Sequence, residues 1–313
     1  MTDKGLVRQR NEDTLLLHDL EHNRGLPEAG EQEHVMGRKG VLLAVLDGMG
    51  GAASGDVASR LGADVIREKM TQLAPTTLCE MAEALGQVSM DAHREIRARA
   101  ARDDECEGMG TTLLGAAVVA GALVYVHVGD SRAYLVRRGK LYLLTEDQSL
   151  FQELYTAGDL SDKEAEEGLH SNVILQALGV NDRIFPCVFQ LPLRGDDLLL
   201  ICSDGLTDLV AFDRLEELAN THADDLPQLA KTLVAQANAR GGYDNISVVL
   251  AQFSGEALPA VHDDPTEDIV EPRPMSVSSI PSPGRVALRD YTLLFLVLLV
   301  MAVLSALMVW AGG

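Results

Sequence analysis

Twenty consecutive residues without a charged side chain, from Tyr291 to Trp310, constrain the fold of this chain more than any other feature. In an α-helix they extend about 30 Å, which is the thickness of the hydrocarbon core of a bilayer. Tyr291 and Trp310 stand at the two ends, where membrane interfaces favour aromatic residues. The run has no amphipathic period, which argues against the alternative of a buried core helix. We therefore predict one C-terminal transmembrane helix over residues 290–311.

The residues before this helix indicate a tethered domain. Arg285 and Arg289 directly precede the apolar run, so the positive-inside rule predicts a single-pass membrane protein with the rest of the chain in the cytoplasm. Residues 255–289 hold six of the 11 prolines, several serines and a group of acidic residues. With few apolar side chains to pack, they predict an extended Pro/Ser-rich acidic linker. One folded domain is then expected over residues 1–254.

The charge balance narrows the class of partner. The sequence has 47 Asp and Glu residues against 26 Lys and Arg, a formal net charge of −21. A field of this sign repels phosphate backbones, so we expect no nucleic acid partner, and it attracts cations. No pair among the four cysteines has C-x-x-C spacing, so a zinc site or a redox dithiol has no support.

Hydrophobic periodicity predicts a mixed domain with antiparallel strands. Two long helices are expected, over Ser54–Leu73 and from Thr77 to about Arg102, and the second opens with the capping box Thr77-Leu-Cys-Glu80. Tight turns at Ala120-Gly121 and Arg138-Gly139 join β-rich segments into hairpins. The expected strands are 41–46, 111–120, 123–128, 132–136, 185–191, 197–202 and 246–253, with further helices at 149–157, 161–167 and 226–239. The pattern favours α+β layers over a doubly wound parallel sheet.

Acidic residues recur where the apolar strands begin or end. The sites are Glu12-Asp13, Asp47-Gly48, Asp130, Asp204 and Asp244. Strand ends hold carboxylates at one edge of a sheet, and converging carboxylates repel each other unless a cation lies among them. A single Asp-Gly is most simply a turn. Five acidic sites in one chain instead predict an oxygen-ligated Mg²⁺ or Mn²⁺ centre.

Six short motifs, in order and spacing, resemble those of the metal-dependent protein phosphatases, the PPM or PP2C-type serine/threonine phosphatases, in their bacterial form. The motifs are Arg8–Asp13 (R-Q-R-N-E-D), Asp47–Gly51 (D-G-M-G-G), Gly110–Thr112, Gly129–Arg132, Ser203–Gly205 and Gly242–Asn245. The resemblance covers about residues 2–254. It implies a four-layer α-β-β-α sandwich with a two-metal centre, and hydrolysis of phosphoserine or phosphothreonine in proteins by a water activated between the ions.

The resemblance also implies a role for each matching residue. Asp47 resembles the carboxylate that bridges two Mn²⁺ or Mg²⁺ ions, and the Gly48 carbonyl resembles a further ligand. The other positions that match residues serving the two ions are Glu12, Asp13, Asp204 and Asp244. Asp130 resembles a ligand of a third, weaker ion. Arg8 resembles the arginine that clamps the substrate phosphate, for which a planar guanidinium is suited. Arg8 and Glu12 are thus the expected catalytic residues, with Arg10 the local competitor for the phosphate.

Two positions depart from the family pattern. Met49 stands where eukaryotic members often have a histidine proposed to protonate the leaving group, which Met49 cannot do, and Gln148 stands where relatives often have histidine.

Two functions stay open: an active, membrane-tethered phosphatase, or a non-catalytic scaffold that binds phosphoproteins or senses a signal. The intact acidic set favours the phosphatase. Its expected partners are Ser/Thr phosphoproteins, including a membrane Ser/Thr kinase and its substrates, and we expect a monomeric catalytic domain.

Overall fold

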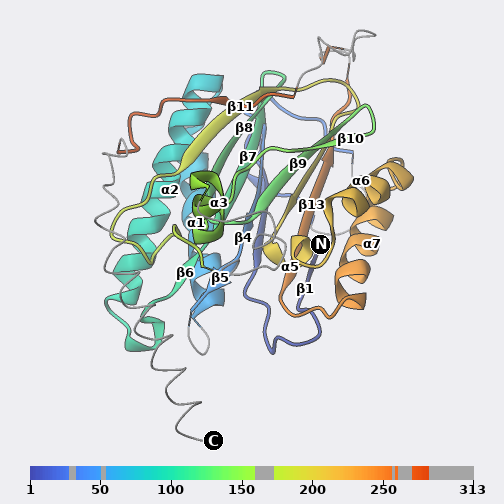
Figure 1. Ribbon diagram of the computed structural model, residues 1–313. Helices are drawn as coiled ribbons and strands as arrows, with labels where there is room; N and C mark the ends of the chain where they lie inside the picture. The colour runs from blue at the N-terminus through green and yellow to red at the C-terminus, as the bar shows by residue number, and fades with distance from the viewer. Residues whose placement is uncertain (28–32, 51–53, 159–172, 256–257, 260–269, 282–313) are drawn as a thin grey trace, which may run out of the picture. The chain divides into compact units, whose positions relative to one another are not determined.

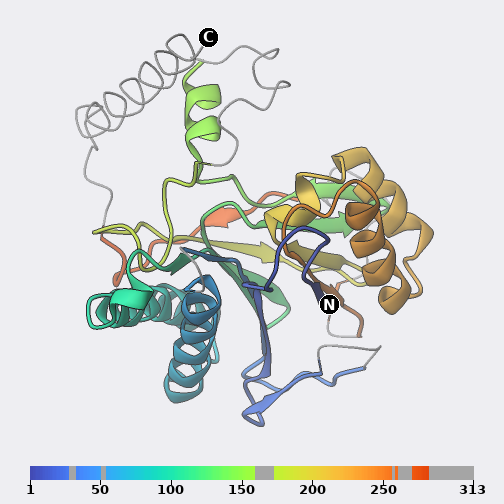
Figure 2. The ribbon, with the colours of Figure 1, turned by 90° about the horizontal axis from the view of Figure 1, so that it is seen from below.

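The computed structural model describes residues 1–27, 33–50, 54–158, 173–255, 258–259 and 270–281. Residues 1–280 form one compact unit, in which two antiparallel sheets are stacked and helices cover both outer faces (Figures 1 and 2). Helices α1 (Gly55–Leu73) and α2 (Leu78–Ala100) pack on the larger sheet. Helices α6 (Phe212–Thr221) and α7 (Leu226–Ala239) pack on the smaller one. The expected α+β architecture with antiparallel sheets is confirmed.

The larger sheet has the strand order β14-β11-β8-β7-β4-β2-β3, and the smaller one β1-β13-β12-β9-β10. The strands of the larger sheet are β2 (Thr14–Asp19), β3 (Arg24–Gly25), β4 (Val41–Leu46), β7 (Leu113–Val119), β8 (Ala122–Val128), β11 (Cys187–Pro192) and β14 (Arg273–Pro274). Those of the smaller sheet are β1 (Thr2–Asp3), β9 (Arg132–Arg137), β10 (Lys140–Leu143), β12 (Leu198–Cys202) and β13 (Ile246–Gln252). The remaining elements are the pair β5 (Gly48–Met49) and β6 (Gly110–Thr111), a 3₁₀ turn (Asp104–Cys106), α3 (Leu150–Ala157) and α5 (Asp204–Thr207).

The core is divided into three apolar layers because side chains alternate between the two faces of each strand. In β4, Leu42 and Ala44 join the cluster under α1 and α2, whereas Leu43 and Val45 join the cluster between the sheets. The third layer lies between the smaller sheet and helices α6 and α7. Strands buried on both faces have continuous apolar sequences, which explains the unbroken run at 41–46.

Local turn and cap chemistry follows the sequence closely. Ala120 and Gly121 have φ of 49° and 76°, and Arg138 and Gly139 have 54° and 72°. Positive φ at both central residues is the type I′ hairpin geometry, so the two predicted hairpins are confirmed. The capping box at Thr77 is present as well. The Thr77 side chain accepts from the backbone N–H of Glu80, and the Glu80 side chain accepts from the backbone N–H of Thr77.

Several elements differ from the sequence-based expectation. Helix α6 was not expected, and β10, the second strand of the hairpin at 138–139, was expected without stated bounds. The expected strand at 111–120 is interrupted, since Thr111 pairs in β6 and Leu113 begins β7. The helix expected at 161–167 lies outside the described residues.

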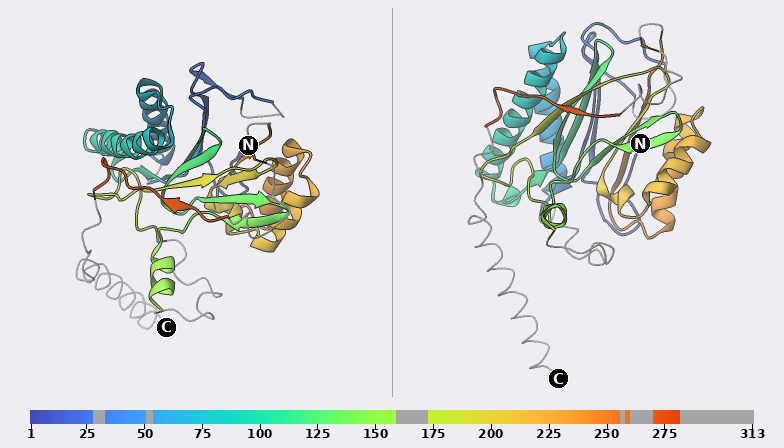
Figure 3. Two further views of the ribbon diagram at one scale, coloured as in Figure 1. Left: turned by 90° about the horizontal axis from the view of Figure 1, so that it is seen from above. Right: turned by 45° about the horizontal axis from the view of Figure 1, so that its top comes forward.

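Residues 270–280 belong to this compact unit and pack against the larger sheet and α2. Strand β14 pairs with β11 (Figure 3). Val277 and Ile280 lie against α2. Ser278 donates from its backbone N and its Oγ to the carboxylate of Glu83 on α2. Within the predicted linker of residues 255–289, the described residues 270–280 are therefore paired with β11 and packed against α2. No helix within the described ranges is long and apolar enough to cross a membrane, and the predicted span at 290–311 lies outside them.

Candidate metal centre

Four predicted acidic residues meet around a fifth, Asp47. The negative charges of Asp13, Asp204, Asp130 and Asp244 all act on the carboxyl of Asp47. Asp47 follows the end of β4, Asp13 precedes β2, and Asp130 lies in the β8–β9 turn. Asp204 is the first residue of α5, and Asp244 lies in the loop before β13. Strand ends from both sheets thus converge, as the sequence predicted.

The backbone at Asp47 is fixed by two threonines. Its N–H donates to Thr112 Oγ1 at 3.0 Å, and its carbonyl accepts from Thr112 N at 2.8 Å and from Thr111 Oγ1 at 2.9 Å. Both threonines are fully buried. The Gly110-Thr-Thr112 motif therefore holds the strand end that carries Asp47.

Asp13 is tied to the opposite side of the centre by a serine. Ser203 Oγ donates to Asp13 Oδ2 at 2.8 Å and accepts from Ser247 N at 3.0 Å. Ser203 is the residue before Asp204, and Ser247 lies in β13. One buried hydroxyl thus connects the start of β2, the start of α5 and β13.

Burial and like charge together raise the pKa values of these carboxyls. Burial raises the pKa of Asp13 to about 6, and the charge of Asp244 adds to it. Burial and the charges of Asp147 and Asp208 raise the pKa of Asp130 to about 7. The pKa values of Asp47 and Asp204 are raised well above the ordinary range, first by burial and then by neighbouring carboxylates. Negative charge at this place is unfavourable without a compensating cation.

The donor atoms fit a hard divalent cation. Oδ1 of Asp13, Asp130 and Asp204 is in each case buried without a hydrogen-bond partner. Among the described residues no three acidic, histidine or cysteine side chains are already arranged to hold one ion. Mg²⁺ commonly takes only one or two carboxylates and completes its shell with carbonyls and waters, so such a closed group is not required. The all-oxygen donor set and the buried unpartnered atoms therefore suit Mg²⁺ or Mn²⁺.

Close backbone approach explains the glycine after Asp47. A Cβ on Gly48 would lie 2.2 Å from the carbonyl oxygen of Gly55 and 2.5 Å from that of Glu12. A Cβ on Gly55 would lie 2.9 Å from the carboxyl carbon of Glu12. These two glycines let Glu12 approach the first turn of α1, and burial there raises its pKa.

Arg8 is bound to a carboxylate of the centre. Its Nη2 donates to Asp244 Oδ2 at 2.6 Å, and its side chain is 50% exposed. The charges of Asp244, Glu12 and Asp47 all act on it. Arg10 is exposed, and its carbonyl accepts from Asn245 Nδ2. The ion pair with Asp244 distinguishes Arg8 from its competitor.

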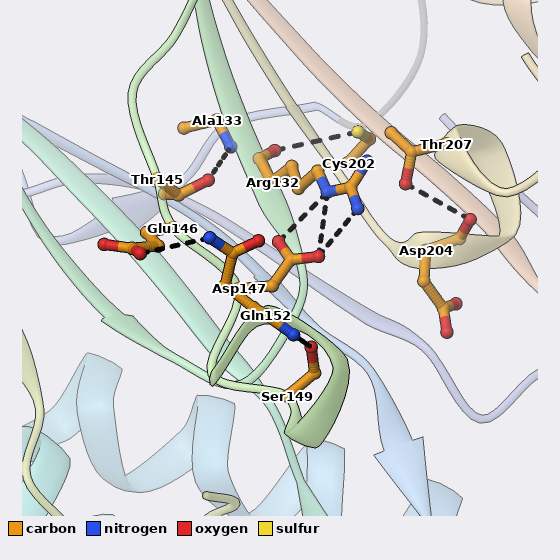
Figure 4. A network of polar contacts seen from close by, with 10 residues as sticks. All are labelled: Arg132, Ala133, Thr145, Glu146, Asp147, Ser149, Gln152, Cys202, Asp204 and Thr207. Carbon is orange, nitrogen blue, oxygen red and sulfur yellow. Dashed lines mark hydrogen bonds and ion pairs between the residues drawn. The ribbon is translucent and has the colours of Figure 1, made fainter. Parts of the chain in front are cut away.

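An ion pair at the start of β9, two residues after Asp130, was not expected from the sequence. Arg132 Nε and Nη2 donate to both carboxylate oxygens of Asp147, at distances from 2.7 to 3.1 Å (Figure 4). Next to it, Gln148 Oε1 accepts from Gly129 N at 3.0 Å, in the turn that presents Asp130. Gln148 thus supports the backbone turn that presents Asp130.

Two further carboxylates near the centre were also missed. Asp208 acts on the pKa values of Asp130 and Asp204, and it follows Asp204 by one helical turn, a spacing that could have found it. Asp56, in the first turn of α1, has a buried unpartnered Oδ1 and acts on Glu12. Its position after a glycine-rich segment gave no signal.

Comparison with known proteins decides the family. The sequence profile of the family described as Protein phosphatase 2C matches residues 23–246. The chain belongs to the protein phosphatase 2C family. Over 252 residues it is 34% identical to the serine/threonine phosphatase stp of Listeria monocytogenes, with 80% of this chain and 93% of that protein covered.

Solved structures of such phosphatases have the same fold. The serine/threonine phosphatase of S. agalactiae superposes with a TM-score of 0.71 at 30% identity, covering 82% of this chain and 98% of that one. The catalytic domain of the phosphatase PstP, in complex with two manganese ions, superposes with a TM-score of 0.65 at 30% identity, covering 82% and 96%. The chain is thus a metal-dependent, PPM-type protein serine/threonine phosphatase of the bacterial kind, and its substrates are phosphoproteins.

Proposed function

We propose that this phosphatase works with two Mn²⁺ or Mg²⁺ ions held by Asp13, Asp47, Asp204, Asp244 and the carbonyl of Gly48. The observation that carries the proposal is the charge around Asp47: four carboxylates act on it, and three of them keep a buried, unpartnered Oδ1. When bound, the two ions supply the Lewis acidity that lowers the pKa of a water nucleophile for in-line attack on phosphorus.

Arg8 binds the phosphate of the substrate in this mechanism. Asp244 accepts from its Nη2, which orients the guanidinium toward the centre, and the group carries further donors that suit two phosphate oxygens. Glu12 lies beside Arg8 and serves the centre through water, with its backbone fixed by Asn245 Oδ1 at 2.8 Å. Met49 has no proton to donate, so the leaving oxygen is not protonated from that position.

Asp130 and Asp204 are the proposed ligands of a third, weaker ion. Each has a buried, unpartnered Oδ1, and the charge of Asp130 raises the pKa of Asp204. The largest like charges on Asp130 come from Asp147 and Asp208, whereas the like charge on Asp13 comes from Asp244. The two aspartates therefore have different acidic neighbours. This separation supports a peripheral role.

A metal titration tests the proposed centre. The full-length protein, purified in detergent, is stripped of metal, and hydrolysis of a phosphothreonine peptide is followed as Mn²⁺ or Mg²⁺ is added. Turnover should appear with the ion and vanish on chelation, and calorimetry should resolve two tight sites. Full turnover in excess chelator, or a single tight site in a fully active enzyme, would overturn the two-ion proposal.

We further propose that residues 290–311 anchor the enzyme to the cytoplasmic face of a membrane. The support is the length and apolarity of the run and the basic residues that precede it. An acidic chain gains nothing from anionic lipid headgroups, so an apolar anchor has to provide the attachment. Membrane phosphoproteins, including a Ser/Thr kinase, are then the substrates nearest to the site.

A further inference from the structure

The loop that carries Arg8 is a fixed surface of the molecule. Asn245, which is buried, donates from Nδ2 to the carbonyls of Lys4 and Arg10, at 2.9 Å each, and so closes the loop at both ends. Inside it, the amides of Leu6 and Val7 donate to Gly242 O at 2.8 and 3.2 Å. The loop therefore holds its shape without substrate.

Three apolar side chains are exposed on this fixed loop and the turn that it contacts. Leu6 is 67% exposed, Val7 61% and Tyr243 63%. A Cβ on Gly242 would lie 3.0 Å from Leu6 Cγ, and one on Gly241 would lie 2.4 Å from Tyr243 Cζ, so these side chains lie over adjacent glycines. Single exposed apolar residues are ordinary, but three on two bonded loops form a patch that calls for an occupant.

The patch is continuous with the phosphate site. Val7 precedes Arg8, and Tyr243 precedes Asp244, so the two residues of the Arg8–Asp244 ion pair are each flanked by a patch residue. Lys4, Arg10 and Arg240 are exposed on the same two segments, in a chain whose net charge is −21. Local cations beside an apolar surface suit a phosphorylated, partly apolar ligand more than a cationic one.

We propose that Leu6, Val7 and Tyr243 form a specificity surface that binds an apolar side chain next to the phosphoserine or phosphothreonine of the substrate. A peptide whose phosphate is bound at Arg8 has its neighbouring residues within reach of the patch. Because the loops are already ordered, little conformational entropy is lost when the peptide binds. The inference rests on the proposed role of Arg8 as the phosphate ligand.

The test compares phosphopeptides that differ only beside the phosphorylated residue. The full-length enzyme in detergent is given pairs with leucine or serine at each flanking position, and an aryl phosphate serves as a substrate without flanking residues. We expect kcat/KM to favour leucine by about tenfold at one position at least, the size expected for burial of one or two methylene groups. Leu6→Ser and Tyr243→Ser should reduce that preference below about twofold and leave aryl phosphate turnover unchanged.

Matched variants separate specificity from folding. Val35→Ser removes an apolar side chain that is 90% exposed elsewhere, and it should keep the preference. Leu6→Met and Tyr243→Phe should keep it too, because they stay apolar. A wild-type enzyme without any preference, or patch variants that lose aryl phosphate turnover in the same proportion, would overturn the proposal. The proposal would also be overturned if the patch variants lost binding to phosphatidylglycerol vesicles and kept the peptide preference. The patch would then be a lipid contact. If Arg8→Ala leaves peptide turnover unchanged, the phosphate site itself is wrong.

Discussion

The carboxylates of the centre differ in how many like charges surround them, which predicts different effects of neutralising each one. Asp47 faces Asp13, Asp204, Asp130 and Asp244, whereas the largest like charges on Asp130 are Asp147 and Asp208. Asp47→Asn should therefore weaken Mn²⁺ binding in calorimetry and lower turnover by at least about a hundredfold. Asp130→Asn should lower turnover less and keep two tight sites. Loss of both tight sites in Asp130→Asn would contradict this division.

A buried histidine away from the centre predicts how stability depends on pH. His93 is buried, and its Nδ1 accepts from Gly179 N at 3.1 Å, so it is neutral in the folded state. Burial and the nearby arginines lower its pKa to about 4. The unfolded chain then takes up a proton before the folded one as the pH falls from about 6.5 to 4, and the free energy of unfolding should drop on the order of 2–3 kcal/mol there.

The matched variant for this prediction is His93→Asn, which keeps an acceptor for Gly179 N but does not titrate. Urea unfolding of both proteins between pH 7 and pH 4 should give a shallower fall for the variant. Equal slopes would show that His93 is not the group responsible.

Among secondary-structure elements, those set by local chemistry were predictable and those set by distant contacts were not. The capping box at Thr77 and the hairpins at 120–121 and 138–139 need only neighbouring residues, and all are present. Helix α6 could have been found, since Phe212, Leu215 and Leu218 recur every three residues. Strand β14 could not, because a proline-rich segment without periodicity has no signal for its pairing with β11.

The same distinction holds within the site. The acidic residues were placed by motif and spacing, and the structure brings them together. Asn245 belongs to one of those motifs, and its side chain donates to the carbonyls of Lys4 and Arg10. These bonds depend on where the fold places two backbone carbonyls, which a sequence motif does not indicate. The Arg132–Asp147 pair joins two separate segments, which spacing alone does not reveal.

Substitution of Gly86 in α2 tests whether the segment of residues 270–280 packs on this helix. A Cβ on Gly86 would lie 2.4 Å from Val277 Cγ1 and 3.1 Å from Ile280 Cδ1, so alanine should displace the segment. Gly86→Ala is expected to lower the melting temperature of a chain ending at residue 281. In a chain ending at residue 269 the same change should raise stability by about 1 kcal/mol, because alanine favours the helix. The same sign in both chains would show that Val277 and Ile280 do not pack against Gly86.

For the whole molecule, the compact unit that ends at Ile280 shortens the proposed tether. Nine residues, 281–289, separate it from the proposed span, and fully extended they reach at most about 30 Å. Had the linker begun at residue 255, as the sequence suggested, its contour would be several times longer. Such a tether would keep the active site in a thin layer at the bilayer surface, where the effective concentration of membrane-bound substrate would reach the millimolar range.

Deleting residues 290–313 tests this arrangement. The shortened protein should appear in the soluble fraction and hydrolyse a soluble phosphopeptide at the full-length rate, because the span contributes nothing to the centre. On a phosphopeptide coupled to lipid in the same vesicles, the full-length enzyme should be faster by about a hundredfold at nanomolar enzyme, since only it shares the surface with its substrate. A shortened protein that still sediments with membranes would contradict the anchor. Digestion of the full-length domain by protease added outside intact cells would contradict the cytoplasmic orientation.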